Sequence, residues 1–357
     1  MGNYVDLSIA FLIALIATYL LTYPVKKLAI KLSVMDFPNH RKMHKAITPK
    51  LGGLAIFLGV ILGGFYIQPH HEHLPEIFFG ALVILLTGAI DDKYQVRPVI
   101  KLTGQLIAAS FLISSGLIID QITIPLFGMV DLGLASVLVT VLWIVGITNA
   151  INLIDGLDGL ATGVSTIALI SMFIMAMIDA QLVAASICII LIGANIGFLF
   201  HNFYPAKIYM GDTGSNFLGY AIAVVSMLGL FKNITLFSFI IPVIVLAVPI
   251  FDTLFAIVRR AYNKENIMLA DNKHIHYRLI EAGYSHRKSV LIIYGFSAMF
   301  GATAILFSNA QPYITLLAAF LIVLIMHVFA EYAGIVLNGK RPIVNSMRKL
   351  LKRKRNK

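Results

Sequence analysis

Long apolar runs separated by short polar segments organise this sequence and limit what it can fold into. A helix needs about 20 apolar residues to cross the hydrocarbon core of a bilayer, and most of these runs reach that length. Of the 357 residues, 59 % are hydrophobic and 13 % are charged, whereas water-soluble domains carry charge on about a quarter of their residues. The composition therefore excludes a water-soluble globular protein and predicts an all-α, polytopic membrane protein.

The apolar runs predict eleven transmembrane helices. The third run is short and the fifth and sixth are nearly continuous, so counts of ten and twelve stay open at this point. The expected helices cover residues 5–25, 51–68, 76–90, 99–118, 131–152, 159–178, 181–200, 214–231, 235–258, 289–308 and 312–331.

The basic residues lie on one side of this predicted membrane layout. All 28 Lys and Arg residues except Lys232 fall in odd-numbered connections, at the start of the helix that follows the third connection, or after the last helix. Loops rich in Lys and Arg stay in the cytoplasm, so we expect the N-terminus outside and the C-terminus in the cytoplasm. Residues 1–335 then form a membrane-embedded domain and residues 336–357 a basic cytoplasmic tail. We expect that tail to contact anionic membrane lipids rather than nucleic acid.

Two adjacent carboxylates, Asp91 and Asp92, follow the third apolar run at its cytoplasmic end. Two ionised carboxylates beside a low-dielectric region repel each other and need a cation. A divalent ion such as Mg²⁺, which binds one or two carboxylates together with substrate phosphates, suits that need. An isolated pair of this kind is also compatible with a solvated loop that has no role.

A second polar cluster lies where the fifth and sixth runs meet. Its members recur every third residue, so neighbouring members share a helical stripe, but a regular helix could not aim all of them at one point. Gly156 and Gly159 permit the helix to break there, which would line a cavity with polar groups. The alternative is a plain polar hairpin between two spans. The members are Asn149, Asn152, Asp155 and Asp158.

Further polar residues lie at the eighth and ninth runs and in the long loop that follows. Asp212 stands where the eighth helix begins, a place that favours phosphate or a helix cap. Asp252 lies within the ninth run, where pairing with Arg259 or Arg260 is an equal alternative to a role in the site. His274 and His276 alternate in a basic stretch, which favours pyrophosphate over metal binding, or else an ordinary solvated loop.

These candidate residues share one membrane face, although the layout was derived from Lys and Arg alone. The acidic residues on the other face form no motif. A transporter or channel would need polar residues through the middle of the membrane, which this sequence does not present. The pattern therefore favours an enzyme at the cytoplasmic face over a carrier of nucleotide sugars or lipids.

Five stretches resemble the polyprenyl-phosphate N-acetylhexosamine-1-phosphate transferases in order, spacing and membrane side. They are DFPNHRKMHKAITPKLGG (36–53), GAIDDKYQVRPVIKLTGQ (88–105), NAINLIDGLDGLATG (149–163), FHNFYPAKIYMGDTGSNFLG (200–219) and HIHYRL (274–279). The resemblance implies an eleven-helix enzyme of the bacterial cytoplasmic membrane that uses Mg²⁺, with Mn²⁺ as the alternative ion. Such an enzyme moves a sugar 1-phosphate from a UDP-sugar to undecaprenyl phosphate at the cytoplasmic face and releases UMP.

The same resemblance implies a role for each candidate residue. Asp212 is the expected metal ligand, and Asp91 or Asp92 shares the ion or accepts the proton of the lipid phosphate. The cluster between the fifth and sixth runs is expected to bind the nucleotide sugar. An aromatic ring would stack on uracil, and cationic side chains would surround the phosphates. The residues expected to bind substrate are Lys101, Asn152, Asp155, Asp158, Tyr209, His274, His276 and Arg278.

The loop HIHYRL is similar to the HIHHRL form found in the GlcNAc-1-phosphate branch, from which it departs at Tyr277. The N-terminal half most resembles the TagO branch, which starts wall teichoic acid synthesis, so UDP-GlcNAc is the expected donor. A phospho-MurNAc-pentapeptide transferase, or a transferase for another UDP-N-acetylhexosamine, is the alternative within the family. A CDP-alcohol phosphotransferase fits poorly, because Leu157 and Asp158 stand where that class needs Ala-Arg. The sequence leaves a homodimer open.

Overall fold

The computed structural model describes residues 4–37, 47–124, 128–229, 240–264, 274–308 and 312–332. It is mostly helical. The helices are α1 (Tyr4–Lys31), α2 (Gly52–Ile67), α3 (Leu74–Tyr94), α4 (Pro98–Ser114), α5 (Ala135–Ile154), α6 (Leu160–Ile178), α7 (Leu182–Asn202), α8 (Gly211–Gly229), α9 (Ile240–Val245), α10 (Ala247–Tyr262), α11 (Ile275–Glu281), α12 (His286–Phe307) and α13 (Pro312–Tyr332). The proposed tail, residues 336–357, lies outside the described residues.

Each expected span contains helix, and six of the described helices are long and apolar enough to cross a membrane: α1, α3, α5, α6, α7 and α12. The helices α2 and α4 are shorter apolar helices of 16 and 17 residues. The range 235–258 was expected as one span, but its described part holds two helices, α9 and α10, which meet at Leu246. The chain is therefore a polytopic, mostly helical membrane protein.

Two small antiparallel hairpins add strand that the expectation of an all-α fold did not include. Strands β1 (Met35–Asp36) and β2 (Thr48–Pro49) pair with each other beside the end of α1. Strands β3 (Gln121–Ile124) and β4 (Gly128–Asp131) pair between α4 and α5. The first hairpin matters for the site, because β2 leads directly into α2.

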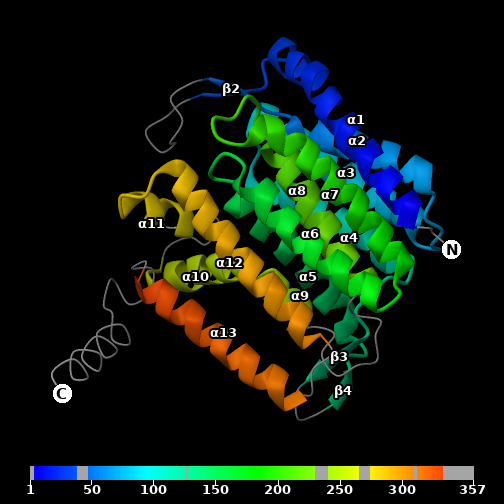
Figure 1. The fold of residues 1–357 in the computed structure, drawn as a ribbon, viewed down its shortest axis with the longest axis vertical. Coiled ribbons are helices and arrows are strands. Elements are labelled where there is room, and N and C mark those ends of the chain that lie inside the picture. Colours follow the sequence, from blue (N-terminus) through cyan, green and yellow to red (C-terminus); the bar gives the residue numbers. More distant parts are fainter. Residues whose placement is uncertain are drawn as a thin grey trace.

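The helices α5–α8 form the middle of the fold, drawn in green in Figure 1, between α1 and α2 on one flank and α10, α12 and α13 on the other. Glycines let the backbones near the start of α8 approach closely. A Cβ on Gly53 of α2 would lie 2.1 Å from the Gly214 nitrogen, and one on Gly88 of α3 would lie 2.5 Å from the Asp212 carbonyl oxygen. These contacts pack α2 and α3 against the first turn of α8.

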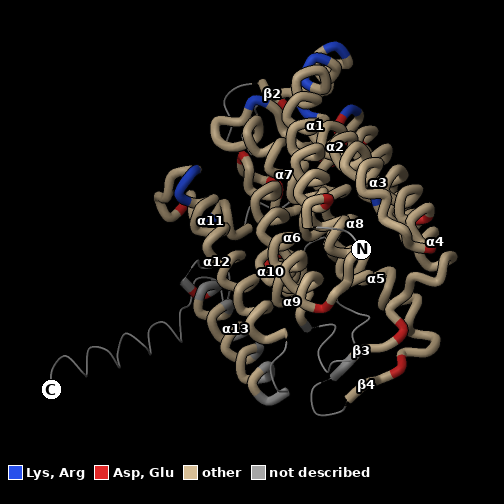
Figure 2. The backbone as a smooth tube through the Cα atoms, turned by 45° about the vertical axis from the view of Figure 1, so that its right-hand side comes forward, with Lys and Arg blue, Asp and Glu red and all other residues tan. Residues whose placement is uncertain are grey.

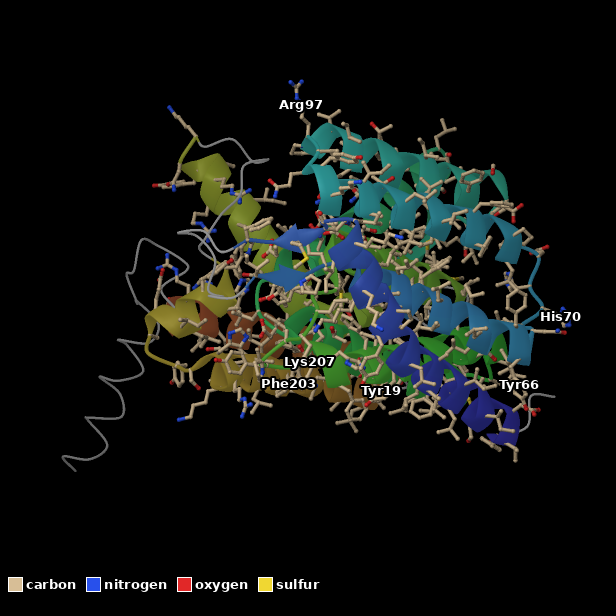
Figure 3. All side chains as sticks on the ribbon, turned by 90° about the horizontal axis from the view of Figure 1, so that it is seen from above. Tyr19, Tyr66, His70, Arg97, Phe203 and Lys207 are labelled. Atoms are coloured by element: carbon tan, nitrogen blue, oxygen red, sulfur yellow. The ribbon has the colours of Figure 1, made fainter. Side chains whose placement is uncertain are left out.

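The helix ends that carry the candidate residues meet at one end of the bundle. Lys and Arg gather at this end, near the end of α1 and β2 and beside α11 (Figure 2). Tyr66 and His70, near the α2–α3 connection, lie together at the opposite end, away from Lys207 (Figure 3). The fold thus brings segments far apart in the sequence to a single polar region.

Candidate active site

The start of α8 is held by a carboxylate from another helix. Gly211 has a φ of 71°, a left-handed conformation that glycine adopts without strain, and it turns the chain into the helix. The Oδ1 of Asp92 accepts a hydrogen bond from the Asp212 N–H at 3.0 Å. Its Oδ2 accepts from the Thr213 N–H at 3.0 Å and from the Thr213 hydroxyl at 2.6 Å. The fully buried Asp92 side chain therefore caps α8 across the helix interface.

Asp212, oriented by this cap, lies at the centre of a polar cluster. Its Oδ2 is 2.7 Å from the Lys101 ammonium, which is also 3.1 Å from Asp91 Oδ2. The side-chain amide of Asn152 donates to Asp212 Oδ1 at 2.6 Å and to the Ser215 hydroxyl at 2.8 Å. Helix α4 begins with proline at its first turn, which places Lys101 at the same end as Asp91. One ammonium therefore shields two carboxylates from each other.

The break between α5 and α6 forms the opposite wall. Helix α5 ends at Ile154 and α6 begins at Leu160, so residues 155–159 form the loop that the glycines were expected to allow. Asp158 Oδ2 accepts from the Ala206 N–H at 2.9 Å, and the Asp158 N–H donates to His286 Nε2 at 3.0 Å. Burial, and then the charges of Asp212 and Asp92, raise the pKa of Asp155 to about 8. Asp155 is therefore mostly protonated at pH 7 as long as no cation lies beside it.

These walls enclose a cavity of about 200 Å³. Its described lining residues come from six separate segments of the chain. They are Asp36, Lys50, Asn152, Asp155, Gly156, Leu157, Asp158, Asn202, Tyr209, Gly211, Asp212, Tyr277 and His286. Five of the residues expected to bind substrate or metal line this cavity: Asn152, Asp155, Asp158, Tyr209 and Asp212. Lys101 and Asp91 join the site through Asp212, and Asp92 joins it through the backbone of α8.

The histidines of HIHYRL lie outside the cavity lining. His274 Nδ1 is 3.0 Å from Asp252 Oδ2, and the Ile275 N–H donates to Asp252 Oδ1 at 3.0 Å. The structure thus pairs Asp252 with the start of α11, a partner that neither alternative in the sequence analysis had named. Arg278 donates to Glu281 at 3.1 Å.

His276 is fully buried beneath the loop between α5 and α6. A Cβ on Gly156 would lie 2.2 Å from its Nε2, so the glycine makes room for the ring. Burial lowers the pKa of His276 to about 4, which leaves the ring neutral at pH 7. Within HIHYRL, the described side chain that lines the cavity is Tyr277.

Several lining residues were not among the sequence candidates: Asp36, Lys50, Asn202, Tyr277 and His286. The first two belong to the stretch 36–53, which carried the family resemblance, and that stretch was the available signal for them. His286 begins α12, and its ring packs against Tyr204 in a tilted arrangement with a centroid separation of 4.5 Å. No local pattern distinguishes such a histidine from a solvated one.

The donor atoms in the cavity fit a hard divalent cation. Asp212, Asp155 and Asn152 offer oxygen atoms, the ligands that Mg²⁺ prefers. Burial, and then the charges of Asp212 and Asp92, raise the pKa of Asp155, and a bound cation would favour its ionised form. Among the described residues, no three His, Cys, Asp or Glu side chains already converge as a complete ligand set. The residues therefore fit an ion shared with substrate phosphates better than one held by the protein alone.

Comparison with known proteins identifies the family of this chain. Residues 74–230 match Glycosyl transferase family 4. The chain is 44 % identical over 354 residues, 98 % of each protein, to a probable undecaprenyl-phosphate N-acetylglucosaminyl 1-phosphate transferase of Bacillus subtilis. It is 35 % identical, over 86 % of this chain and 84 % of the other, to the decaprenyl-phosphate N-acetylglucosaminephosphotransferase of Mycobacterium tuberculosis. An undecaprenyl-phosphate alpha-N-acetylglucosaminyl 1-phosphate transferase of Escherichia coli K12 is 24 % identical over 91 % of each chain. This chain therefore belongs to Glycosyl transferase family 4, the family of the polyprenyl-phosphate N-acetylhexosamine-1-phosphate transferases.

Proposed function

We propose that this protein transfers GlcNAc-1-phosphate from UDP-GlcNAc to undecaprenyl phosphate and releases UMP. The observation that carries the proposal is the cluster around Asp212, where carboxylates, an amide and an ammonium converge beside a cavity. The 44 % identity with the Bacillus subtilis relative, over 98 % of each chain, supports UDP-GlcNAc as the donor and undecaprenyl phosphate as the acceptor. The reaction joins two anions, so it needs charge neutralisation and positioning more than covalent help from the protein.

In this reaction an oxygen of the lipid phosphate attacks the phosphorus attached to the sugar. A new P–O bond forms there, the bond from that phosphorus to the oxygen bridging to UMP breaks, and UMP leaves with the bridging oxygen. Mg²⁺, bound at Asp212, would supply neutralising charge to the diphosphate. Asp91 is the proposed acceptor of any proton on the attacking phosphate. Its Oδ2 is paired with the flexible Lys101 side chain at 3.1 Å, whereas the fully buried Asp92 accepts three hydrogen bonds from the start of α8.

Lys101 and the loop between α5 and α6 position these groups. The Lys101 ammonium bridges Asp91 and Asp212 and can follow the negative charge as the phosphates approach. Asn152, Asp155 and Asp158 are the proposed contacts of the nucleotide sugar, and Tyr209 offers a ring for uracil. His274, His276 and Arg278 then act by packing α11 against that loop, since none of them lines the cavity.

We further propose that all eleven predicted spans cross the membrane, with the N-terminus outside and the cavity facing the cytoplasm. The distribution of Lys and Arg and the gathering of the site residues at one end of the bundle support this orientation. Residues 1–335 then form the catalytic domain, and the basic residues of 336–357 contact anionic lipids. A cell-wall polymer, with wall teichoic acid as the first candidate, is the proposed destination of the lipid-linked product.

The test is an assay with purified protein, undecaprenyl phosphate, Mg²⁺ and a panel of radiolabelled UDP-sugars. We expect UMP and a labelled lipid product from UDP-GlcNAc, and essentially none from UDP-MurNAc-pentapeptide, because a site that closes around the smaller sugar collides with the lactyl-peptide arm that GlcNAc lacks. Preference for the muramyl donor would overturn the choice of sugar and leave the family intact. Movement of UDP-sugar into vesicles without UMP release would overturn the enzymatic function.

A further inference from the structure

Lys50 reaches the cavity from the first hairpin. It directly follows β2, and its N–H donates to the Val34 carbonyl at 3.1 Å, which continues the pairing of Asp36 with Thr48. Its side chain is 20 % exposed and lines the cavity. The ammonium therefore stands at the wall of the cavity with part of its surface open to an incoming molecule.

Backbone hydrogen bonds fix this position relative to Asp212. The Tyr209 N–H donates to the Pro49 carbonyl at 2.8 Å. The Gly52 N–H donates to the Tyr209 carbonyl at 3.0 Å, and the Gly53 N–H donates to the Met210 carbonyl at 2.9 Å. The residues on both sides of Lys50 are thus paired with the segment that leads into α8. Main-chain hydrogen bonds therefore fix where the Lys50 side chain begins, and its ammonium is placed by Asp36 and Asp92.

The charges around the cavity leave a role for this ammonium. Lys50 lies 3.3 Å from Asp36 Oδ1 and 3.7 Å from Asp92 Oδ1, and Asp92 is already satisfied by the amides and hydroxyl of α8. Among the described lining residues, Lys50 is the sole Lys or Arg. The lining carboxylates Asp158 and Asp212 would repel an anionic ligand that met no cation there.

We propose that Lys50 is the residue that binds the diphosphate of the UDP-linked donor. This inference rests on the proposed function, and it assigns to Lys50 the cationic contact that the sequence pattern had suggested for His274 and His276. Those rings are buried away from the cavity, whereas Lys50 faces it. An ammonium is a strong partner for phosphate oxygens, and the ion pairs with Asp36 and Asp92 already hold this one at the cavity wall.

The experiment compares the wild type with Lys50→Gln, Lys50→Arg and the control Lys207→Gln. Lys207 carries the same charge at the same end of the bundle, is exposed and does not line the cavity (Figure 3). We expect Lys50→Gln to raise the KM for UDP-GlcNAc by roughly tenfold or more, the scale of a lost charge-assisted hydrogen bond. It should weaken inhibition by UDP by a similar factor and leave inhibition by uridine unchanged. Lys50→Arg should recover most of the affinity, and Lys207→Gln should behave as wild type.

A purely structural role for the Lys50–Asp36 ion pair gives a different pattern. Lys50→Gln and Asp36→Asn would then lower the unfolding temperature together and would weaken UDP and uridine equally, which would overturn the inference. Unchanged KM and UDP inhibition in Lys50→Gln would also overturn it. If the wild type released no UMP from UDP-GlcNAc, the proposed function would fail. Direct titration of UDP into the wild type and Lys50→Gln would still decide the role of Lys50.

Discussion

Asp92 and Asp212 are both carboxylates of the same site, but their surroundings favour different roles for them. Asp92 gives both oxygens to the first turn of α8, while Asp212 faces the cavity with a side chain that is 29 % exposed. The first arrangement stabilises a helix end, and the second leaves an oxygen ligand accessible to substrate. A chemical role should therefore separate from a structural role when each is replaced by the nearly isosteric Asn.

We expect Asp212→Asn to lower turnover by on the order of 10²-fold or more with little change in unfolding temperature, because it removes one charge-stabilising group. Asp92→Asn should lower the unfolding temperature in addition to turnover. One of its two acceptor oxygens would become an NH₂ donor that faces the N–H groups of Asp212 and Thr213. Thermal unfolding in detergent and UMP release measure the two effects. Near-normal turnover in Asp212→Asn would remove this residue from the metal site.

The sequence allowed most of the acidic site residues to be predicted, because paired or periodic carboxylates beside apolar runs are unusual. It did not separate Asp91 from Asp92, because adjacent residues on a helix point to different neighbours, and those neighbours come from α4 and α8. Lys50 escaped prediction for a related reason. Its significance depends on backbone pairing with Tyr209 and Met210, which no local pattern in either segment reveals.

Among the elements, α11 is a short helix that supports the site although its histidines do not line the cavity. Asp252 holds its first turn through His274 and the Ile275 N–H, and both side chains of that pair are 4 % exposed. The next residue, His276, is then pressed beneath Gly156. The helix therefore supports the loop between α5 and α6 from below.

This packing predicts a loss of stability in acid. His276 is neutral in the folded protein because burial lowers its pKa to about 4, while an unfolded histidine has a pKa of about 6.5. Below pH 6.5 the unfolded chain therefore binds a proton that the folded chain does not, and stability falls as the pH falls toward 4. Wild type should lose roughly 2 kcal/mol more than His276→Gln between pH 7.5 and pH 5.0, measured by thermal or denaturant unfolding. Equal losses in the two proteins would show that the ring is not neutral and buried.

The apolar runs allowed the helices to be predicted. The departures from that prediction depend on contacts between distant segments, which the periodicity of a sequence does not reveal. The range expected as one ninth helix divides at Leu246, between α9 and α10. The β3–β4 hairpin lies in a segment with a weak strand signal beside a strong helical one. Each strand of the β1–β2 hairpin is only two residues long, and the hairpin lies where the Tyr209 N–H, in the segment before α8, donates to the Pro49 carbonyl.

On the scale of the whole molecule, orientation in the membrane is the property that all the proposed roles share. Cys188 is the single cysteine of the chain and is completely buried, so the natural protein provides a silent background for thiol labelling. Ala282, between α11 and α12, is exposed at the end that carries the site, and Met129 of β4 is 56 % exposed. We expect an impermeant maleimide to label Met129→Cys in intact cells and Ala282→Cys only after permeabilisation. The reverse pattern would place the site on the outer face.

The cap on α8 has a consequence for how the protein is made. Asp92 and the amide of Asp212 are separated by 120 residues, so α3 enters the membrane long before its partner has left the ribosome. Until then a carboxylate stands at the membrane edge without the amides that stabilise it, which is costly in a medium of low polarity. The early helices can insert, but their final docking must wait for residues 211–213. We therefore expect the proposed active site to stay unassembled until residues 211–213 have been made, and a truncated product that ends before α8 to release no UMP.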